Sequence, residues 1–241
     1  MKNRLLIYGT FFALLLGGFY YFIFKDYDFS ASTLDVINDN IKDFTFVDQN
    51  GDSITERKIE DKVYVAEYFF TTCKSICPRM NANMRRVYDV YKEEESFVIL
   101  SHSCMPEVDS VALLKAYEQK MLTGNVVKQK DGSYMIEPAE NIAQPKNKNW
   151  FFLTGDKTKL YDMARQGYKI DDNKPDSTQN IADQFIHTQF FALIDKQRRL
   201  RGIYDGLKED EVQKLITDIK GLLKEKITTK RFMGGFTNNP G

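Results

Sequence analysis

The alternation of hydrophobic and polar positions predicts a series of short strands and amphipathic helices. Phe44–Thr55 alternates apolar and polar side chains around Asn50-Gly51, which is the strongest short-range indication of a β-hairpin. Lys62–Phe70 is dense in β-branched and aromatic residues, which is typical of a buried central strand. From Pro78 onward apolar residues recur at helical spacing, and proline suits the first turn of a helix because no partner for its missing N–H is needed there.

The same reasoning extends to the rest of the chain. It predicts strands at 96–103, 150–154, 187–195 and 199–206, and helices at 108–121, 155–166 and 208–224. The stretch 122–149 is rich in Gly, Lys and Asn, which indicates an inserted hairpin or loop. Because strands alternate with helices, we expect an α/β protein with a parallel pair of strands. The element order predicts a thioredoxin-like three-layer α/β/α sandwich at 43–225, opened by the hairpin, with a flexible tail at 226–241.

A long uncharged segment precedes this domain. The run Leu5–Phe24 has about 20 residues, just enough for a helix to cross a hydrocarbon core about 30 Å thick. Lys2 and Arg4 stand before the run, which favours a cytoplasmic N-terminus and an exported domain. We therefore expect a membrane anchor with a transmembrane helix at 1–26 and a polar linker at 27–42. A cleaved signal peptide is the alternative.

The composition narrows the classes of function. Lys+Arg and Asp+Glu both total 34, so no global positive field exists that would attract nucleic acid. The chain has three cysteines, too few for a scaffold held together by disulfides. It has two histidines, His102 and His187, so any site that contains histidine must use one of them.

Two of the cysteines, Cys73 and Cys77, lie where the central strand gives way to a helix. If Cys77 opens that helix, its unsatisfied N–H groups and dipole lower the thiol pKa and make thiolates available. Thiolates serve both metal binding and disulfide exchange, so the pair alone does not decide between them. Three residues separate the cysteines, one more than in the common redox motif, which gives the sulfurs a wider reach around an ion. A disulfide remains possible, and two buried apolar cysteines are the third alternative.

His187 is expected near this pair because of the topology. Ligands gather at the carboxyl ends of the parallel strands in open α/β sheets. The strand that begins at His187 is expected to run antiparallel to them, so its start falls at the same edge. Two thiolates and an imidazole suit copper, and zinc also accepts them. A solvent-exposed histidine is the alternative.

These motifs resemble the Sco/SenC family. The family pattern F-x-T-x-C-x-x-x-C-P matches FFTTCKSICP, and its histidine strand with the following acidic residue and turn matches HTQFFALIDKQRRLRGIYDG. NWFFLTG and MARQGYKI also match, so the resemblance extends over most of 44–223. It implies a copper-binding thioredoxin-like domain, anchored in the bacterial inner membrane and facing the periplasm, that helps to assemble the binuclear copper centre of cytochrome c oxidase. By position, Cys73, Cys77 and His187 would bind Cu(I) or Cu(II).

Some relatives in this family act instead as thiol–disulfide oxidoreductases. In that alternative Cys73 attacks, Cys77 resolves the mixed disulfide and His187 tunes their acidity. The partner is accordingly a copper-site subunit of cytochrome c oxidase or another copper or thiol client protein. A peroxide-reducing role is less favoured because the loop lacks the cysteine and proline placement of peroxiredoxin-like enzymes. A non-catalytic interaction protein would not need the cysteine pair.

The chain departs from the family pattern in two places. Lys74 stands where a proline is usual, and in SCMPEVDS Met105 occupies an aspartate position while Asp109 is kept. The same loop supplies three potential copper donors, His102, Cys104 and Met105. We expect Cys104 or Met105 to supplement the copper site, or Cys104 to form an alternative disulfide with one of the pair. A packed methionine and a small apolar cysteine are the alternative.

Overall fold

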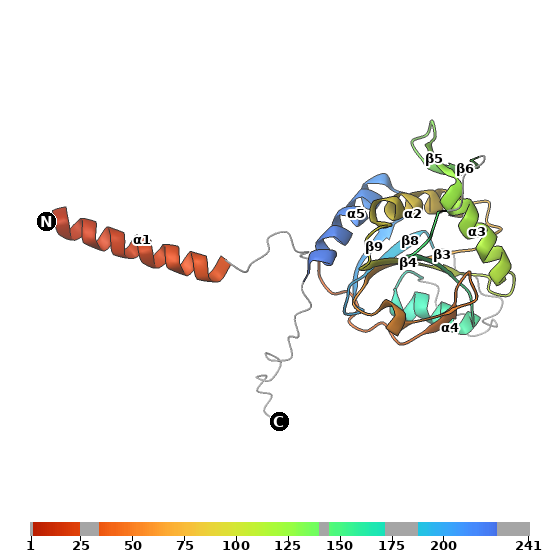
Figure 1. The fold of residues 1–241 in the computed structure, drawn as a ribbon, viewed down its shortest axis with the longest axis horizontal. Coiled ribbons are helices and arrows are strands. Elements are labelled where there is room, and N and C mark those ends of the chain that lie inside the picture. Colours follow the sequence, from red (N-terminus) through yellow and green to blue (C-terminus); the bar gives the residue numbers. More distant parts are fainter. Residues whose placement is uncertain (1, 25–33, 140–144, 172–187, 226–241) are drawn as a thin grey trace, which may run out of the picture. The chain divides into compact units, whose positions relative to one another are not determined.

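The computed structural model describes residues 2–24, 34–139, 145–171 and 188–225, which belong to two units (Figure 1). The first unit contains helix α1 (Lys2–Phe24). Many of its apolar side chains are exposed, among them Leu6, Phe11, Leu14 and Phe19. Within the described residues, no helix has the length and hydropathy that crossing a membrane requires.

The second unit is built on a five-stranded sheet in the order β7-β4-β3-β8-β9 (Figure 1). Its strands are β3 (Val63–Phe69), β4 (Phe97–Ser103), β7 (Trp150–Leu153), β8 (Phe190–Ile194) and β9 (Leu200–Asp205). β3, β4 and β7 run parallel to one another, and β8 runs antiparallel to β3 and β9. Every residue of the central strand β3 is buried, as its dense apolar run predicts.

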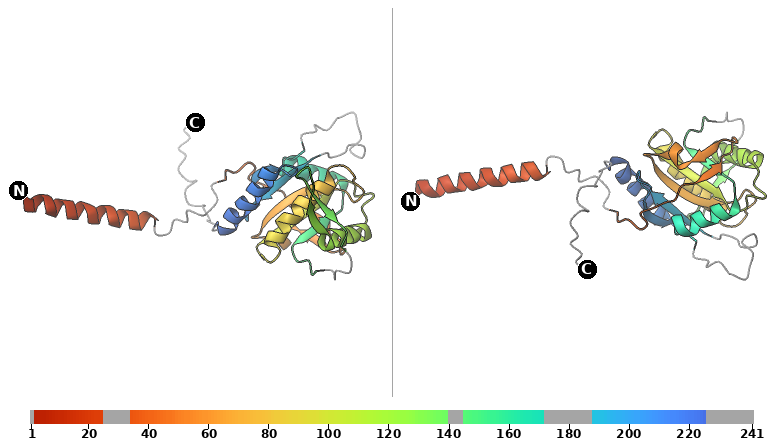
Figure 2. Two further views of the ribbon diagram at one scale, coloured as in Figure 1. Left: turned by 90° about the horizontal axis from the view of Figure 1, so that it is seen from above. Right: turned by 90° about the horizontal axis from the view of Figure 1, so that it is seen from below.

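Other elements cover both faces of this sheet (Figures 1 and 2). One face carries α2 (Cys77–Tyr91), α3 (Val111–Thr123) and α5 (Glu209–Lys224). The other carries α4 (Lys157–Asp162) with a π-helical turn (Met163–Gly167), a 3₁₀ turn (Glu56–Ile59), and the hairpin of β1 (Thr45–Val47) and β2 (Ser53–Thr55). Each face has its own buried apolar core. The predicted three-layer α/β arrangement with an N-terminal hairpin is confirmed.

The predicted N-terminal hairpin is present, and the insertion, predicted as a hairpin or a loop, also contains a hairpin. In the first, the Asp48 carboxylate accepts hydrogen bonds from the N–H groups of Asn50 and Asp52, and Gly51 adopts a φ of 83°, which glycine tolerates without strain. In the insertion, β5 (Asn125–Lys128) pairs with β6 (Tyr134–Glu137). The two extra strands form their own sheet, so the insertion does not extend the central one.

The described part of the predicted linker packs on the domain. Ile37 N–H donates to Leu200 O at 2.8 Å, and the Arg201 guanidinium donates to Leu34 O. Ile41 is fully buried in the apolar core on the α4 side of the sheet, where burial of its side chain stabilises the packed segment. Packing therefore begins before residue 43. Residues 27–33 and the predicted tail at 226–241 lie outside the described residues.

Candidate metal centre

The two cysteines lie on one tight turn between β3 and α2. Cys73 N–H donates to Phe70 O at 3.2 Å, and Cys77 is the first residue of α2, followed by Pro78. Cys77 therefore opens the helix, as predicted. Both thiols are free; Cys73 is partly exposed and Cys77 is buried. The Cys77 thiol hydrogen-bonds with the Cys73 thiol, so the turn brings the two sulfurs together.

The environment of Cys77 acts against the expected thiolate. Burial raises the pKa of the Cys77 thiol, and the hydrogen bond with Cys73 raises it further. The prediction that the helix N-terminus lowers the pKa is therefore wrong for Cys77, because loss of hydration disfavours the charged form more strongly than the helix dipole favours it. A metal ion that binds Cys77 must displace its proton.

A small cavity of about 30 Å³ adjoins Cys73. Its walls come from the cysteine turn, the start of α2, the last turns of α3 and strand β6, and the residues are Thr71, Cys73, Pro78, Tyr117, Lys120, Met121 and Ile136. The contact of the 122–149 insertion with the cysteine turn was not predicted from the sequence. No short-range pattern could have predicted it, because Ile136 is more than sixty positions from Cys73.

Asp109, the acid that the family pattern retains, forms hydrogen bonds with the cysteine turn. It is fully buried, and its carboxylate accepts hydrogen bonds from Thr71 N–H at 3.2 Å, Thr71 Oγ1 at 2.6 Å and Ser103 Oγ at 2.5 Å. Thr71 lies two positions before Cys73. Asp109 therefore links the cysteine turn to the end of β4.

Cys104 and Met105 lie next to the cysteine turn but face the other core. Cys104 N–H donates to Phe69 O at 2.8 Å, while its side chain is buried among the apolar residues on the α4 side of the sheet. Burial raises the pKa of the Cys104 thiol, and the nearby Cys77 adds to this rise. Met105 is partly buried against the same core. The structure thus places Cys104 near the pair in space, with its side chain in a different layer.

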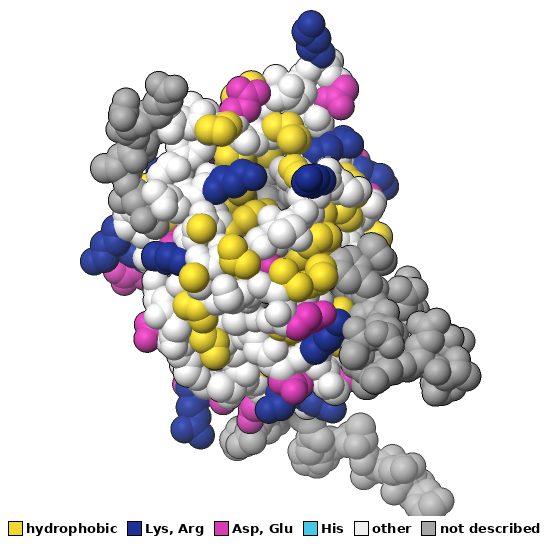
Figure 3. All heavy atoms as spheres, turned by 90° about the vertical axis from the view of Figure 1, so that its right-hand side faces the viewer, with side chains coloured by type: hydrophobic (Ala, Val, Ile, Leu, Met, Phe, Trp, Pro, Cys, Tyr) yellow, Lys and Arg dark blue, Asp and Glu magenta, His cyan; other side chains and the backbone are white. Residues whose placement is uncertain are grey.

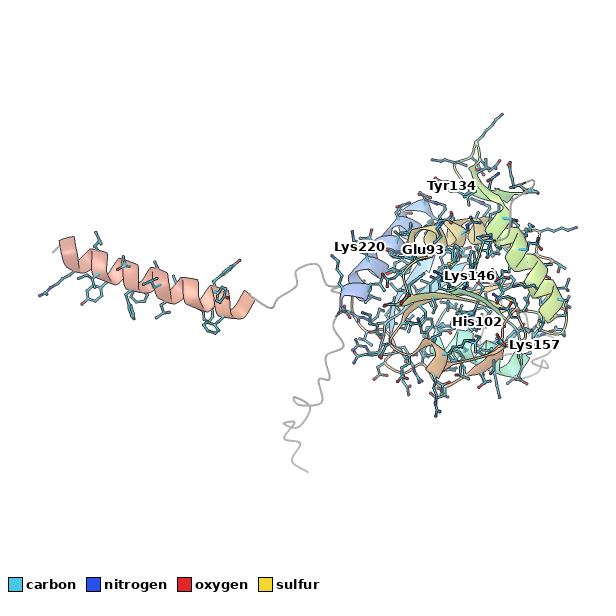
Figure 4. The ribbon with its side chains drawn as sticks, viewed as in Figure 1. Glu93, His102, Tyr134, Lys146, Lys157 and Lys220 are labelled. Atoms are coloured by element: carbon cyan, nitrogen blue, oxygen red, sulfur yellow. The ribbon has the colours of Figure 1, made fainter. Side chains whose placement is uncertain are left out.

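His102 is enclosed by aromatic rings. It is fully buried, with ring centroids 5.1 Å from Tyr68 and 5.3 Å from Phe46, and its Nε2 lies 3.2 Å from the Tyr168 hydroxyl. Burial lowers the pKa of His102 to about 3, so the imidazole is neutral at ordinary pH. Figure 4 shows it inside the domain. Because alternate side chains of a strand point to opposite faces, the structure does not bring His102 to the cysteines, which pack in the α2 core.

His187 lies outside the described residues. The topology on which its assignment rests is confirmed: β8 runs antiparallel to β3, with Ala192 opposite Ala66 and Ile194 opposite Tyr64. The beginning of β8 therefore lies toward the carboxyl end of β3, from which the cysteine turn departs. Among the residues that the structure describes, no three His, Cys, Asp or Glu side chains form a cluster able to hold a metal ion.

One buried acid near the pair was not predicted from the sequence. Glu67, in the middle of β3, is fully buried and accepts a hydrogen bond from Ser101 Oγ at 2.6 Å, while its Oε2 has no partner in the described structure. Burial raises the pKa of Glu67 to about 8, and its carboxyl group contributes to the raised pKa of Cys77. The sequence feature that could have indicated a buried acid is the single glutamate within an otherwise apolar strand.

Known proteins match this chain over nearly the whole α/β domain. The SCO1 protein homolog of Bacillus subtilis is 28% identical over 188 residues, which cover 77% of this chain and 84% of that relative. A SCO1/SenC family lipoprotein from Bacillus anthracis has 27% identity and a TM-score of 0.59, over 78% of this chain and 97% of that structure. BsSco, a member of the Sco family of cytochrome c oxidase assembly proteins that was solved in work on a disulfide switch, has 26% identity and a TM-score of 0.58, over 80% and 98%.

More distant structures share the fold. ScoI of Bradyrhizobium japonicum, solved with copper bound, is 17% identical with a TM-score of 0.52, over 76% of this chain and 98% of that structure. The model of the SCO1/SenC family matches residues 35–127 and 134–224, and these ranges contain Cys73, Cys77, Asp109 and His187. The chain therefore belongs to the SCO1/SenC family.

Proposed function

We propose that this protein binds copper through Cys73, Cys77 and His187 and delivers it to, or prepares, the binuclear copper centre of cytochrome c oxidase. The observation that carries the proposal is the pair of free, adjacent thiols on the turn that leads into α2, in a SCO1/SenC chain. The similarity to BsSco, from a family of cytochrome c oxidase assembly proteins, supports the choice of client.

The donor set suits the transport of copper as cargo. Thiolate sulfur is a soft ligand that favours Cu(I), and imidazole binds copper in either oxidation state. Because burial raises the pKa of Cys77, copper binding releases a proton and weakens at low pH. The partly exposed Cys73 gives a client's cysteine or histidine a donor to displace. Delivery then requires only ligand exchange.

The test is a copper titration of the purified, reduced chain. Cys73→Ser, Cys77→Ser and His187→Ala should each weaken Cu(I) retention against a competing chelator by at least tenfold, because each removes one of three donors. Lys220→Ala, a change on the exposed surface of α5, is the matched control. Full retention by His187→Ala would disprove the three-ligand site, and full retention by a Cys73/Cys77 double variant would disprove the copper function.

A second candidate is thiol–disulfide exchange, favoured by the contact between the two thiols and by the disulfide switch described for BsSco. The Cys73 thiolate attacks a partner disulfide, and Cys77 then attacks Cys73, which forms their disulfide and releases the partner as a dithiol. His187→Ala separates the two functions. It should weaken copper retention at least tenfold and leave reduction of a small disulfide nearly unchanged.

We further propose that residues 1–26 anchor the protein in the bacterial inner membrane, with the domain in the periplasm. The exposed apolar side chains of α1, such as Leu14 and Phe22, support this location, and so does the relative described as a lipoprotein. The full chain should stay with membranes after alkaline washing, whereas residues 28–241 should be released. Protease added to spheroplasts should digest the domain. A mature N-terminus beyond residue 26 would show instead that the segment is a cleaved signal.

A further inference from the structure

The cavity at Cys73 determines what a client protein must touch. A client that exchanges copper or a disulfide with Cys73 has to bring a sulfur or nitrogen to this partly exposed thiol. The client residues on either side of that sulfur or nitrogen then contact the residues that line the cavity, among them Pro78, Lys120 and Ile136. These side chains come from α2, α3 and β6, so the inserted hairpin contributes directly to the approach path.

The hairpin holds Ile136 firmly in this position. The Arg86 guanidinium lies over the Tyr134 ring at 3.9 Å and also forms an ion pair with Glu209 at 2.7 Å, so β6 is fastened to α2 and α5. A side chain at Gly124 would collide with Ile136, which shows how closely the hairpin packs at its base. Figure 4 shows Tyr134 on the hairpin above α2. Ile136 is therefore a fixed wall.

The cavity wall includes Lys120, and Lys74 and Arg79 follow its lining residues Cys73 and Pro78 in the sequence, while the acids Asp131 and Glu137 lie on the hairpin. Lys74, Arg79 and Lys120 are exposed, and no ion pair is formed by any of them within the described part of the chain. The hydrogen bonds from Ser133 lower the pKa of Asp131 in the hairpin turn, and the charge of Arg79 lowers it further by a smaller amount. By contrast, the half-buried Lys157 forms an ion pair with Glu107 at 2.9 Å. In Figure 3, which keeps the hairpin end at the top, hydrophobic side chains gather in the middle of the face shown, with Lys and Arg and some Asp and Glu side chains around them.

We propose that the surface formed by Lys74, Arg79, Lys120 and Ile136 docks an acidic, cysteine-bearing segment of the client protein. This inference rests on the proposed function, because it takes Cys73 as the exchanging thiol. The three cations attract the acidic residues that flank the client's cysteine, and Ile136 contacts an apolar neighbour of that cysteine. Unpaired cations beside a reactive atom accelerate the encounter with an oppositely charged partner.

The test compares two peptides of equal length, each with one cysteine activated as a 2-thiopyridyl disulfide. One peptide carries aspartates around the cysteine and the other carries lysines. The Cys73 thiolate attacks the peptide sulfur, a new disulfide forms, and pyridine-2-thione leaves and is measured by absorbance. At low salt the reduced full chain should react about tenfold faster with the acidic peptide, and the preference should vanish near 1 M salt.

Charge variants locate the surface. Lys120→Glu should reduce the preference at least threefold, whereas Lys220→Glu, on α5, changes the net charge equally and should leave it intact. Figure 4 shows Lys220 at the opposite end of the domain from Lys157 and away from the hairpin. Ile136→Asp should slow the acidic peptide, and Met135→Asp, the neighbouring position that faces the other side of β6, should slow it much less.

The outcomes separate this inference from the proposed function. If Cys73 fails to react even with the uncharged 2,2′-dithiodipyridine, the proposed thiol function itself is wrong. If Cys73 reacts with that reagent but treats both peptides alike, or if Lys120→Glu and Lys220→Glu behave identically, the docking surface is disproved while the thiol function stands.

Discussion

Asp109 Oδ1 accepts a hydrogen bond from Thr71 Oγ1 at 2.6 Å, which joins the loop after β4 to the turn that carries the cysteines. The carboxylate also accepts from Ser103 Oγ. Copper binding and disulfide exchange both require the turn to keep the fold that brings Cys73 and Cys77 together. A buried acceptor that connects the two loops is a direct means of keeping it.

Replacement of Asp109 should therefore loosen the cysteine turn. Asp109→Ala removes the acceptor of three hydrogen bonds, so we expect a loss of about 2–4 kcal/mol in the free energy of unfolding and weaker copper retention. Urea denaturation and chelator competition measure the two effects. Asp131→Ala removes a similar set of contacts from the exposed hairpin turn and should change both values little. Equal effects of the two substitutions would contradict the role given to Asp109.

Glu67 should make the domain less stable as the pH rises. The pKa of Glu67 rises from 4.5 to about 8 on burial, so the folded state binds a proton more tightly than the unfolded state does. The stabilisation from this proton is complete below about pH 4.5 and is lost as the pH approaches 8. Between these limits the wild type should lose on the order of 3 kcal/mol by pH 7.

The Glu67→Gln variant isolates this contribution. Glutamine keeps an acceptor for Ser101 but does not titrate, so the stability of the variant should not show this decline between pH 5 and 8. The difference between wild type and variant, from urea denaturation at each pH, is the measured quantity. A constant difference across the range would show that Glu67 has an ordinary pKa in the folded protein.

His102 should have the opposite effect on the acid side. Burial lowers the pKa of His102 to about 3 from 6.5, so the unfolded state takes up the proton more readily. Stability from the neutral ring is present above about pH 6.5 and is lost as the pH falls toward 3, by about 2 kcal/mol at pH 5. His102→Phe, within the ring cluster of Tyr68 and Phe46, should lose less stability than wild type between pH 6.5 and 4. A parallel decline in both proteins would refute this assignment.

The sulfur-containing loop after β4 allows a separate test of the accessory ligands. Cys104 packs in the α4-side core, so its substitution by serine should cost about 1–3 kcal/mol of stability through a buried hydroxyl. If Cys104 or Met105 supplements copper binding, Cys104→Ser or Met105→Leu should weaken the retention of Cu(I) or Cu(II) against a competing chelator. Wild-type affinity in both Cys104→Ser and Met105→Leu would exclude the accessory role.

The sequence by itself determined the order of elements and the place of the cysteine pair. The apolar run of β3, Pro78 in the first turn of α2 and the alternation around Gly51 are local patterns, and local backbone preferences are sufficient to read them. The antiparallel course of β8 also followed from chain order. The family motif lies on the same contiguous residues, which is why Cys73 and Cys77 were found without any structure.

Only the tertiary structure decided how these groups are surrounded. His102, Cys104 and Met105 lie within four positions of one another, and all three pack on the α4 side of the sheet, which separates them from the core that contains Cys77. The raised pKa of Cys77 depends on side chains packed over it, and so outweighs the helix dipole that the sequence suggested. Ile136 and Cys73 line the same cavity although they lie far apart in the sequence. Burial and long-range contacts arise only when the chain packs, so they cannot be predicted from a local sequence pattern.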